Sequence, residues 1–423
     1  MISDEFKRTK RACHSSYLAM SSVFSLPPML FLTFNQMYGI SYTLLGTLVL
    51  VNFCTQLLID LAFSFFSKYF NVKLTVRLMP LLTSLGLLIY AFSPNLFKEN
   101  PYTGLVLGTV IFSVASGLSE VLLSPLIAAI PGATAKDMSL LHSLYAVGVV
   151  MVVGISSLFF TVFGNENWQY LALFWAVVPL IPAFLFCISP FPLMNSEPVA
   201  AGKKHSRNTV GLALCVACIF LGSAAENTMT NWISGYMENA LGISKTVGDV
   251  LGMAVFAVLL GAGRILHAKF GKSIFNFLLF GMAGAAVCYL AAGLVSNVVL
   301  SFLACIFTGL CTSMLWPGSL IFMEERISGV GVAAYALMAA GGDFGASVAP
   351  QLVGAVIDKV KASAWGLHLA AETAGTAEQI GMKIGMLTAA VFPILGVGVL
   401  LYMKKYFNIQ EEENEREKLR QAD

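Results

Sequence analysis

The sequence predicts an all-α membrane protein with twelve transmembrane helices in two six-helix halves. Of its 423 residues, 57% are hydrophobic and only 11% are charged, whereas soluble domains carry about 25% charged residues. The apolar residues also gather in repeated runs, each long enough for the roughly 20-residue helix that crosses a bilayer. The net charge of +2 is too small to indicate binding to nucleic acid.

Twelve such runs follow one another along the chain. The first follows the basic stretch KRTKR (7–11), contains Pro27 and Pro28, and has no small-residue cleavage site. We therefore expect a retained first span rather than a signal peptide. The runs cover residues 15–38, 44–66, 75–93, 104–130, 139–163, 169–190, 209–236, 247–268, 274–295, 298–323, 329–357 and 380–403.

The distribution of basic residues orients these spans. With a cytoplasmic N-terminus, 20 of the 25 lysines and arginines fall in cytoplasmic segments, as the positive-inside rule requires. An error of one span would destroy this alternation, so both chain ends are predicted to be cytoplasmic. The compact loops and the lack of sorting signals favour the bacterial inner membrane as the location.

The longest polar interruption, NSEPVAAGKKHSRNT (195–209), divides the spans six and six. Gly-Ile-Ser also recurs at 39–41 and 242–244, which suggests a duplicated bundle. Two six-helix halves related by an axis along the membrane normal are the layout of one class of secondary transporters. The predicted units are an N-terminal half (1–194), a cytoplasmic linker (195–209), a C-terminal half (210–403) and a charged cytoplasmic tail (404–423).

Several ionisable residues lie inside the predicted spans, where they are costly and therefore functional candidates by default. Glu120 shares one helical face with three serines, and Glu226 shares one with four hydroxyl or amide side chains. Both faces should point to the bundle interior or to a water-filled cavity rather than to lipid. The residues singled out on this ground are Asp60, Glu120, His142, Glu226, Arg264 and Asp343.

Several motifs give the chain a resemblance to the major facilitator superfamily over almost its whole length. The stretch from 59 to 77 keeps basic residues of the superfamily's signature loop, and GAGRILHAKFGK (261–272) resembles its second-half copy. Within the superfamily, the chain is most similar to the fucose-permease-like group of sugar:cation symporters, although its first span lacks the acidic residue of the proton-coupled members. This likeness rests on SEVLLSP (119–125), HSLYAVG (142–148), GSAAENTMTNW (222–232) and GGDFGASVAP (341–350).

The resemblance implies a central cavity lined by the first, fourth, seventh and tenth spans, with Glu120 and Glu226 inside it. A carboxyl group in low-dielectric surroundings can load and release a proton near neutral pH; a structural glutamate bonded between helices is the alternative interpretation for Glu226. The expected substrate contacts are Gln36, Glu120, Tyr145, Glu226, Asn227, Asn231 and Trp316. Glu120, Glu226 and His142 are expected to couple protons, and Asp60, Arg264 and Asp343 to form gating contacts.

The predicted function is secondary transport of a small polar solute such as a sugar, in symport with H⁺. Symport with Na⁺, export of an amphipathic compound, and a membrane-embedded sensor that moves nothing are the alternatives. No P-loop, HExxH or GxSxG motif is found in the sequence, so we expect neither ATP drive nor an enzyme. We expect a monomer without a cofactor or metal, and we interpret Cys215 and Cys218 as small apolar residues.

Overall fold

The computed structural model describes residues 6–66, 71–131, 135–192, 208–270, 273–327, 332–373 and 375–422. These residues form helices and short connections, and the described part of the chain contains no strand. Ten stretches within it are long and apolar enough to cross a membrane. Helices α7 (Ala135–Phe163) and α16 (Val332–Ala362), of 29 and 31 residues, are also long enough, so the predicted all-α membrane fold is confirmed.

The helices that precede the central linker are called the N-terminal helices. The sixth span is broken into α8 and α9, and the short α5 follows the third span. The N-terminal helices are α2 (Lys7–Tyr38), α3 (Tyr42–Phe66), α4 (Val72–Ala91), α5 (Ser93–Leu96), α6 (Pro101–Ala128), α7, the turn η2 (Asn165–Asn167), α8 (Trp168–Val177) and α9 (Leu180–Ile188).

The helices that follow the central linker are called the C-terminal helices. Two of their spans are interrupted: one by a π-helical segment, η3, and the other between α14 and α15. They are α10 (Asn208–Asn239), α11 (Lys245–Val247), η3 (Gly248–Ala254), α12 (Val255–Phe270), α13 (Ile274–Leu294), α14 (Val298–Thr312), α15 (Leu315–Arg326), α16, α17 (Ala364–Glu372) and α18 (Ala377–Ala422).

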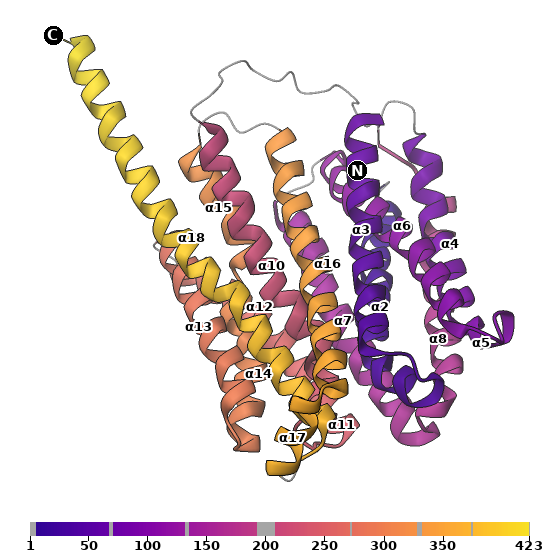
Figure 1. Ribbon diagram of the computed structural model, residues 1–423. Helices are drawn as coiled ribbons and strands as arrows, with labels where there is room; N and C mark the ends of the chain where they lie inside the picture. Colours follow the sequence, from indigo (N-terminus) through magenta and orange to yellow (C-terminus); the bar gives the residue numbers. More distant parts are fainter. Residues whose placement is uncertain are drawn as a thin grey trace.

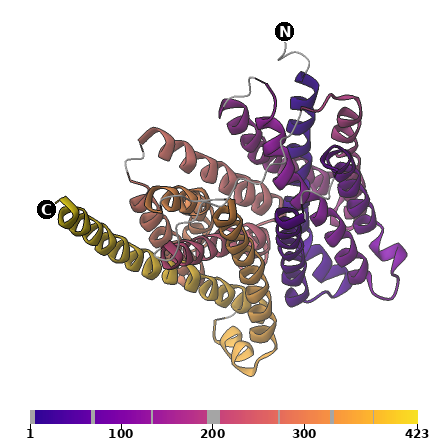
Figure 2. The same cartoon turned by 90° about the horizontal axis from the view of Figure 1, so that it is seen from above.

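The two groups of helices stand side by side (Figures 1 and 2), and the first and last helices reach the same end of the bundle with their terminal ends (Figure 1). We call this end the terminal end and the opposite end, where α11 and α17 lie, the distal end (Figure 1). The 46-residue α18 projects well beyond the other helices at the terminal end. At about 1.5 Å per residue it is roughly twice as long as the ~30 Å hydrocarbon core of a bilayer requires.

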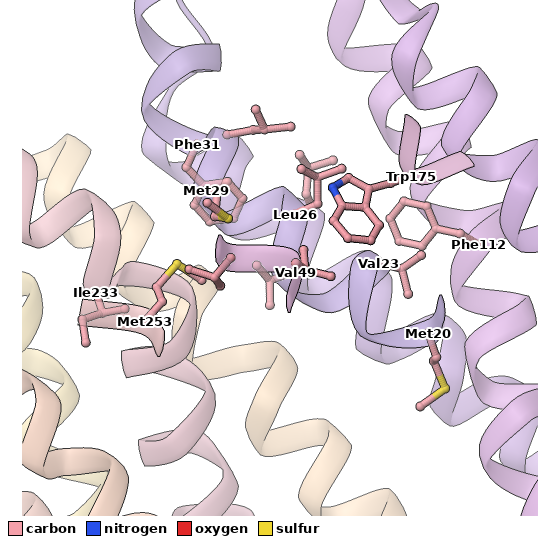
Figure 3. Packing of buried hydrophobic residues seen from close by; sticks show 14 of the residues in the cluster. Met20, Val23, Leu26, Met29, Phe31, Val49, Phe112, Trp175, Ile233 and Met253 are labelled. Atoms are coloured by element: carbon pink, nitrogen blue, oxygen red, sulfur yellow. The ribbon is translucent and has the colours of Figure 1, made fainter. Parts of the chain in front are cut away.

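A continuous apolar core packs the N-terminal helices and reaches the C-terminal ones. Val23, Leu26, Phe112 and Trp175 pack together within the N-terminal helices, and the same cluster extends to Met253 of the C-terminal helices (Figure 3). This core therefore holds the two groups of helices against each other and fixes the residues that face their interface.

Candidate functional site

A polar constellation forms between the two groups of helices. Tyr145 on α7 lies within electrostatic range of Glu120 on α6, Glu226 on α10 and Arg264 on α12. Glu226 is also within range of Arg264. Two N-terminal and two C-terminal helices thus each contribute one side chain to this set, which we call the central site.

A second set of acidic groups adjoins the central site through Glu120. Asp60 on α3 and Asp343 on α16 both lie within electrostatic range of Glu120 and of each other. Asp60 is half-buried, and Asp343 is only 6% exposed. Like charges in such surroundings repel one another, so a cation that enters between them is held favourably.

The carboxylate of Glu226 has one oxygen without a partner. Its Oε2 is buried and accepts no hydrogen bond from the described part of the chain. Its neighbours on α10 bond their own helix instead: Asn227 Nδ2 donates to the carbonyl oxygen of Ser223 at 3.1 Å, and Asn231 Nδ2 to that of Asn227 at 2.8 Å. A buried carboxylate oxygen without a hydrogen bond is costly unless it binds a proton, a cation or a hydrogen-bond donor of a ligand.

Glu120 differs from Glu226 in its access to solvent. Its side chain is exposed, although it lies within electrostatic range of Tyr145 on α7 and Asp343 on α16. Tyr17 on α2 hydrogen-bonds Ser124, one turn along the helix from Glu120. Glu120 is therefore open to solvent, as a residue that binds a soluble ligand must be.

The other predicted site residues lie at different distances from this centre. Trp316 on α15 is half-buried against α16, where a Cβ added to Gly342 would lie 2.2 Å from its ring. It therefore lies beside the turn that carries Asp343. Gln36 is exposed in the last turn of α2, three residues before the left-handed Gly39, and the structure does not bring it to the central site. The side chain of His142 lies outside the described residues.

At the distal end, a carboxylate of the C-terminal helices caps a helix of the N-terminal group. Asp358 on α16 accepts hydrogen bonds from the backbone N–H groups of Tyr42 and Thr43, at 3.2 and 2.6 Å, and from the Thr43 hydroxyl at 2.6 Å. These N–H groups belong to the first turn of α3, where a helix has no internal acceptors for them. The negative charge also complements the positive end of the helix dipole.

A network of side chains reinforces this contact. The Tyr42 hydroxyl donates to Glu378 Oε1 on α18. Asn239 Nδ2 on α10 donates to the Tyr42 hydroxyl oxygen at 2.9 Å and to Glu378 Oε1 at 3.0 Å. Lys361 Nζ lies 3.5 Å from a Glu378 oxygen and 5.6 Å from the centre of the Tyr42 ring. Tyr42, from the N-terminal helices, is therefore held by three helices of the C-terminal group.

Two glycines let the backbones of α3 and α16 touch at this end. A Cβ on Gly46 would lie 2.7 Å from the Cα of Gln351, and one on Gly354 would lie 2.2 Å from the carbonyl oxygen of Tyr42. Larger residues would hold the helices apart. The distal end is therefore closed by direct backbone contact, by the capping carboxylate and by the Tyr42 network.

This closure was not predicted from the sequence. Asp358, Lys361 and Glu378 stand near the ends of predicted spans, where charged residues are ordinarily solvated. Asp358 and Thr43 are also 315 residues apart. The sequence signal for this closure is a Gly four residues before an Asp near the end of one span, Gly354 and Asp358, together with Gly46 early in another span.

A bundle of membrane-spanning helices in two groups, with ionisable residues placed between the groups, is typical of a class of secondary transporters. The model of the Major Facilitator Superfamily matches residues 14–350, so the chain belongs to that superfamily. It is thus a transporter rather than an enzyme, and the resemblance seen in the sequence is confirmed at this level.

Solved structures of the same fold support this assignment. A bacterial homologue of the human lysosomal transporter Spinster, inward-facing and occupied, aligns with TM-score 0.73 and 12% identity over 95% of this chain and 97% of that one. A D-xylose–proton symporter aligns with TM-score 0.71 and 14% identity over 92% and 97%. The nucleoside transporter NupG aligns with TM-score 0.66 and 14% identity over 94% and 98%. Among curated protein sequences, none matches this chain.

Proposed function

We propose that the protein is a secondary active transporter of a small polar solute, a sugar or sugar-like compound, in symport with a cation. The simplest coupling ion is H⁺, and the two halves, 1–194 and 210–403, rock about the central site. The protein works as a monomer in the bacterial inner membrane with both termini in the cytoplasm. The closed distal end is then the outer end, and the conformation faces inward.

The observation that carries this proposal is the state of Glu226. Its buried, unpartnered oxygen lies in the electrostatic range of Arg264 and Tyr145, at the interface that alternating access opens and closes. A solute hydroxyl that donates to this oxygen, or a proton that neutralises it, removes the cost of the unpaired carboxylate. Either event changes the relative stability of the two conformations of the transporter, which is what coupling requires.

The other site residues take supporting roles in this proposal. Glu120, accessible to solvent, exchanges protons with the cytoplasm, with His142 as a second proton carrier. Tyr145 and Trp316 offer aromatic faces to a solute ring, and Asn227 and Asn231 supply polar contacts on α10. Asp60, Asp343 and Arg264 change partners as the terminal end opens and closes.

Two observations support a polar substrate: one from proteins of the same fold and one from the sequence. A D-xylose–proton symporter and a nucleoside transporter share this fold, so the architecture is compatible with polar solutes and proton coupling. The serine, threonine and asparagine side chains around Glu120 and Glu226 supply partners for hydroxyl groups. Within the superfamily we place the chain nearest to the fucose-permease-like group.

An uptake assay tests the proposal. Purified protein in liposomes is given a panel of radiolabelled sugars and nucleosides under an inward proton gradient, an inward Na⁺ gradient, or neither. We expect one solute to accumulate under the proton gradient in the wild type. Glu226→Gln should abolish accumulation, whereas Glu372→Gln, which changes an exposed carboxylate on α17, should not. Absence of accumulation for every solute under both gradients contradicts the proposal.

Export of an amphipathic compound is the second candidate, and one cavity favours it. A space of about 400 Å³ lies among α12, α13 and α14, with mostly apolar lining that includes Leu266, Phe277 and Phe280. Ser313 also lines it, and its carbonyl oxygen accepts a hydrogen bond from Arg264 of the central site at 3.1 Å. Export is supported instead if a lipophilic dye leaves loaded liposomes and no solute accumulates in the uptake assay.

A further inference from the structure

A lysine ammonium bridges the two groups of helices at the distal end. Lys245 on α11 donates from Nζ to the carbonyl oxygen of Met29 on α2 at 2.5 Å. The same Nζ lies 5.6 Å from the centre of the Phe160 ring on α7. On the side of the C-terminal helices it lies 3.6 Å from Asp249 Oδ2. Lys245 therefore belongs to one group and has two of its three contacts in the other.

The carboxylate that holds this ammonium is fully buried. The Asp249 side chain is 0% exposed, and one of its oxygens accepts a hydrogen bond from the Ser234 hydroxyl. The other oxygen, Oδ2, is buried and receives no hydrogen bond from the described residues; it forms an ion pair with Lys245 Nζ at 3.6 Å. This spacing is longer than a hydrogen bond, which leaves the oxygen short of a close partner.

A second carboxylate lies in the same place. Glu238 on α10 is within electrostatic range of both Lys245 and Asp249, and its Oε2 is also buried without a hydrogen-bond donor in the described part of the chain. Asp249 is carried by the π-helical η3, which packs so tightly on α10 that a Cβ on Gly252 would lie 2.5 Å from Met237 Sδ. π-Helical segments are rare and occur frequently at functional sites.

The charges around Asp249 do not balance. The elements packed against η3 are α7, α10, α11, α12 and α14. From the described residues of these elements, Lys245 and Glu238 are the charged groups within its electrostatic range. Two carboxylates thus face one ammonium, and two of their oxygens lack donors. Oxygen ligands of this kind bind a proton or a hard monovalent cation such as Na⁺.

Opening of the distal end would change the occupant of this site. When the two groups part, Lys245 loses the Met29 carbonyl and the Phe160 ring, because both belong to the N-terminal helices. We propose that Asp249 and Glu238 form a second cation site. While the distal end is closed, the Lys245 ammonium occupies this site, and a free proton or Na⁺ replaces it when the distal end opens. The inference rests on the alternating-access cycle of the proposed function, but not on the identity of the cargo.

Distance measurements by double electron–electron resonance test this site without any solute. Spin labels are attached to cysteines introduced at Met37 and Trp365, which are 44% and 56% exposed at the distal end of each group, in a background whose native cysteines are replaced. The full chain in nanodiscs is measured at high and low pH, and at constant pH in sodium or choline chloride. We expect acid or Na⁺ to shift the distance distribution from short to long.

Variants assign that shift to the proposed residues. Asp249→Asn should show the long distance under every condition, and Glu238→Gln should need more acid or more Na⁺ than the parent. Glu372→Gln, an exposed carboxylate at the same end, is the matched control and should respond like the parent. A shift with acid alone identifies the proton, and a shift in sodium at constant pH identifies Na⁺.

Two results overturn the inference: a parent protein whose distances respond to neither cation, or an Asp249→Asn protein that responds as the parent does. If Asp249→Asn fails to fold, as judged by gel filtration, an unchanged response of Glu238→Gln overturns it equally. Because no solute is present, failure here is separate from failure of the uptake assay. A cation response without solute accumulation would leave the site standing and reject only the proposed cargo.

Discussion

Replacement of Asp358 by asparagine should weaken the distal closure by an amount that the structure allows us to estimate. The substitution keeps the shape but removes the charge and one of the two oxygens that receive three hydrogen bonds from Tyr42 and Thr43. A charge at a helix N-terminus contributes about 0.3–1 kcal/mol, rising to ~2 when partly buried, and loss of a capping side chain costs ~1 kcal/mol. We expect the closed state to lose about 1–2 kcal/mol.

This loss corresponds to a shift of about 5–30-fold in the ratio of distal-closed to distal-open molecules. Single-molecule energy transfer between dyes at Met37 and Trp365, one on each group of helices, reports that ratio directly. Lys359→Gln is the matched control, because Lys359 is the exposed neighbour of Asp358. An Asp358→Asn protein with the same ratio as the control would refute the role assigned to the carboxylate.

Three further predictions follow from packing and topology. Gly354→Val should hold the distal end open, since a Cβ there would lie 2.2 Å from the Tyr42 carbonyl oxygen, whereas Gly398→Val, with nothing within 4 Å, should not; energy transfer between the same dyes distinguishes the two. Trp168→Ala should lower the free energy of unfolding in detergent titrations by about 3–5 kcal/mol, because Trp168 is fully buried. Trp365→Ala, at an exposed position, should change it by less than about 0.5 kcal/mol. Fluorescent proteins fused to either chain end should both be cytoplasmic, and an external signal from either would contradict the proposed orientation.

The fold was predictable from sequence because its main determinants are local. Runs of about 20 apolar residues identify spans whatever they pack against. Carboxylates in such runs are rare enough to be conspicuous, so Glu120 and Glu226 were found from sequence, and the structure brings both within range of Tyr145. Their roles in transport remain predictions.

The distal contacts were not predictable because they depend on which helices become neighbours. Asp358 lies near the end of a span and resembles a solvated loop residue until α3 is placed against it. Asp249 stands near the beginning of the predicted span 247–268, where it resembles a solvated end residue until η3 packs against its neighbouring helices and buries it completely. Gln36, predicted as a substrate contact, lies exposed in the last turn of α2, and its role stays a prediction.

Solute-triggered proton movement reports directly whether Glu226 couples solute entry to proton entry. Liposomes that contain the protein and a pH-sensitive dye are given the solute that accumulates in the uptake assay, with no gradient imposed, and the internal pH is recorded for the wild type and for Glu226→Gln. We expect acidification of the lumen in the wild type and none in the variant. Acidification that persists in Glu226→Gln, or solute entry without any proton movement in the wild type, would contradict it.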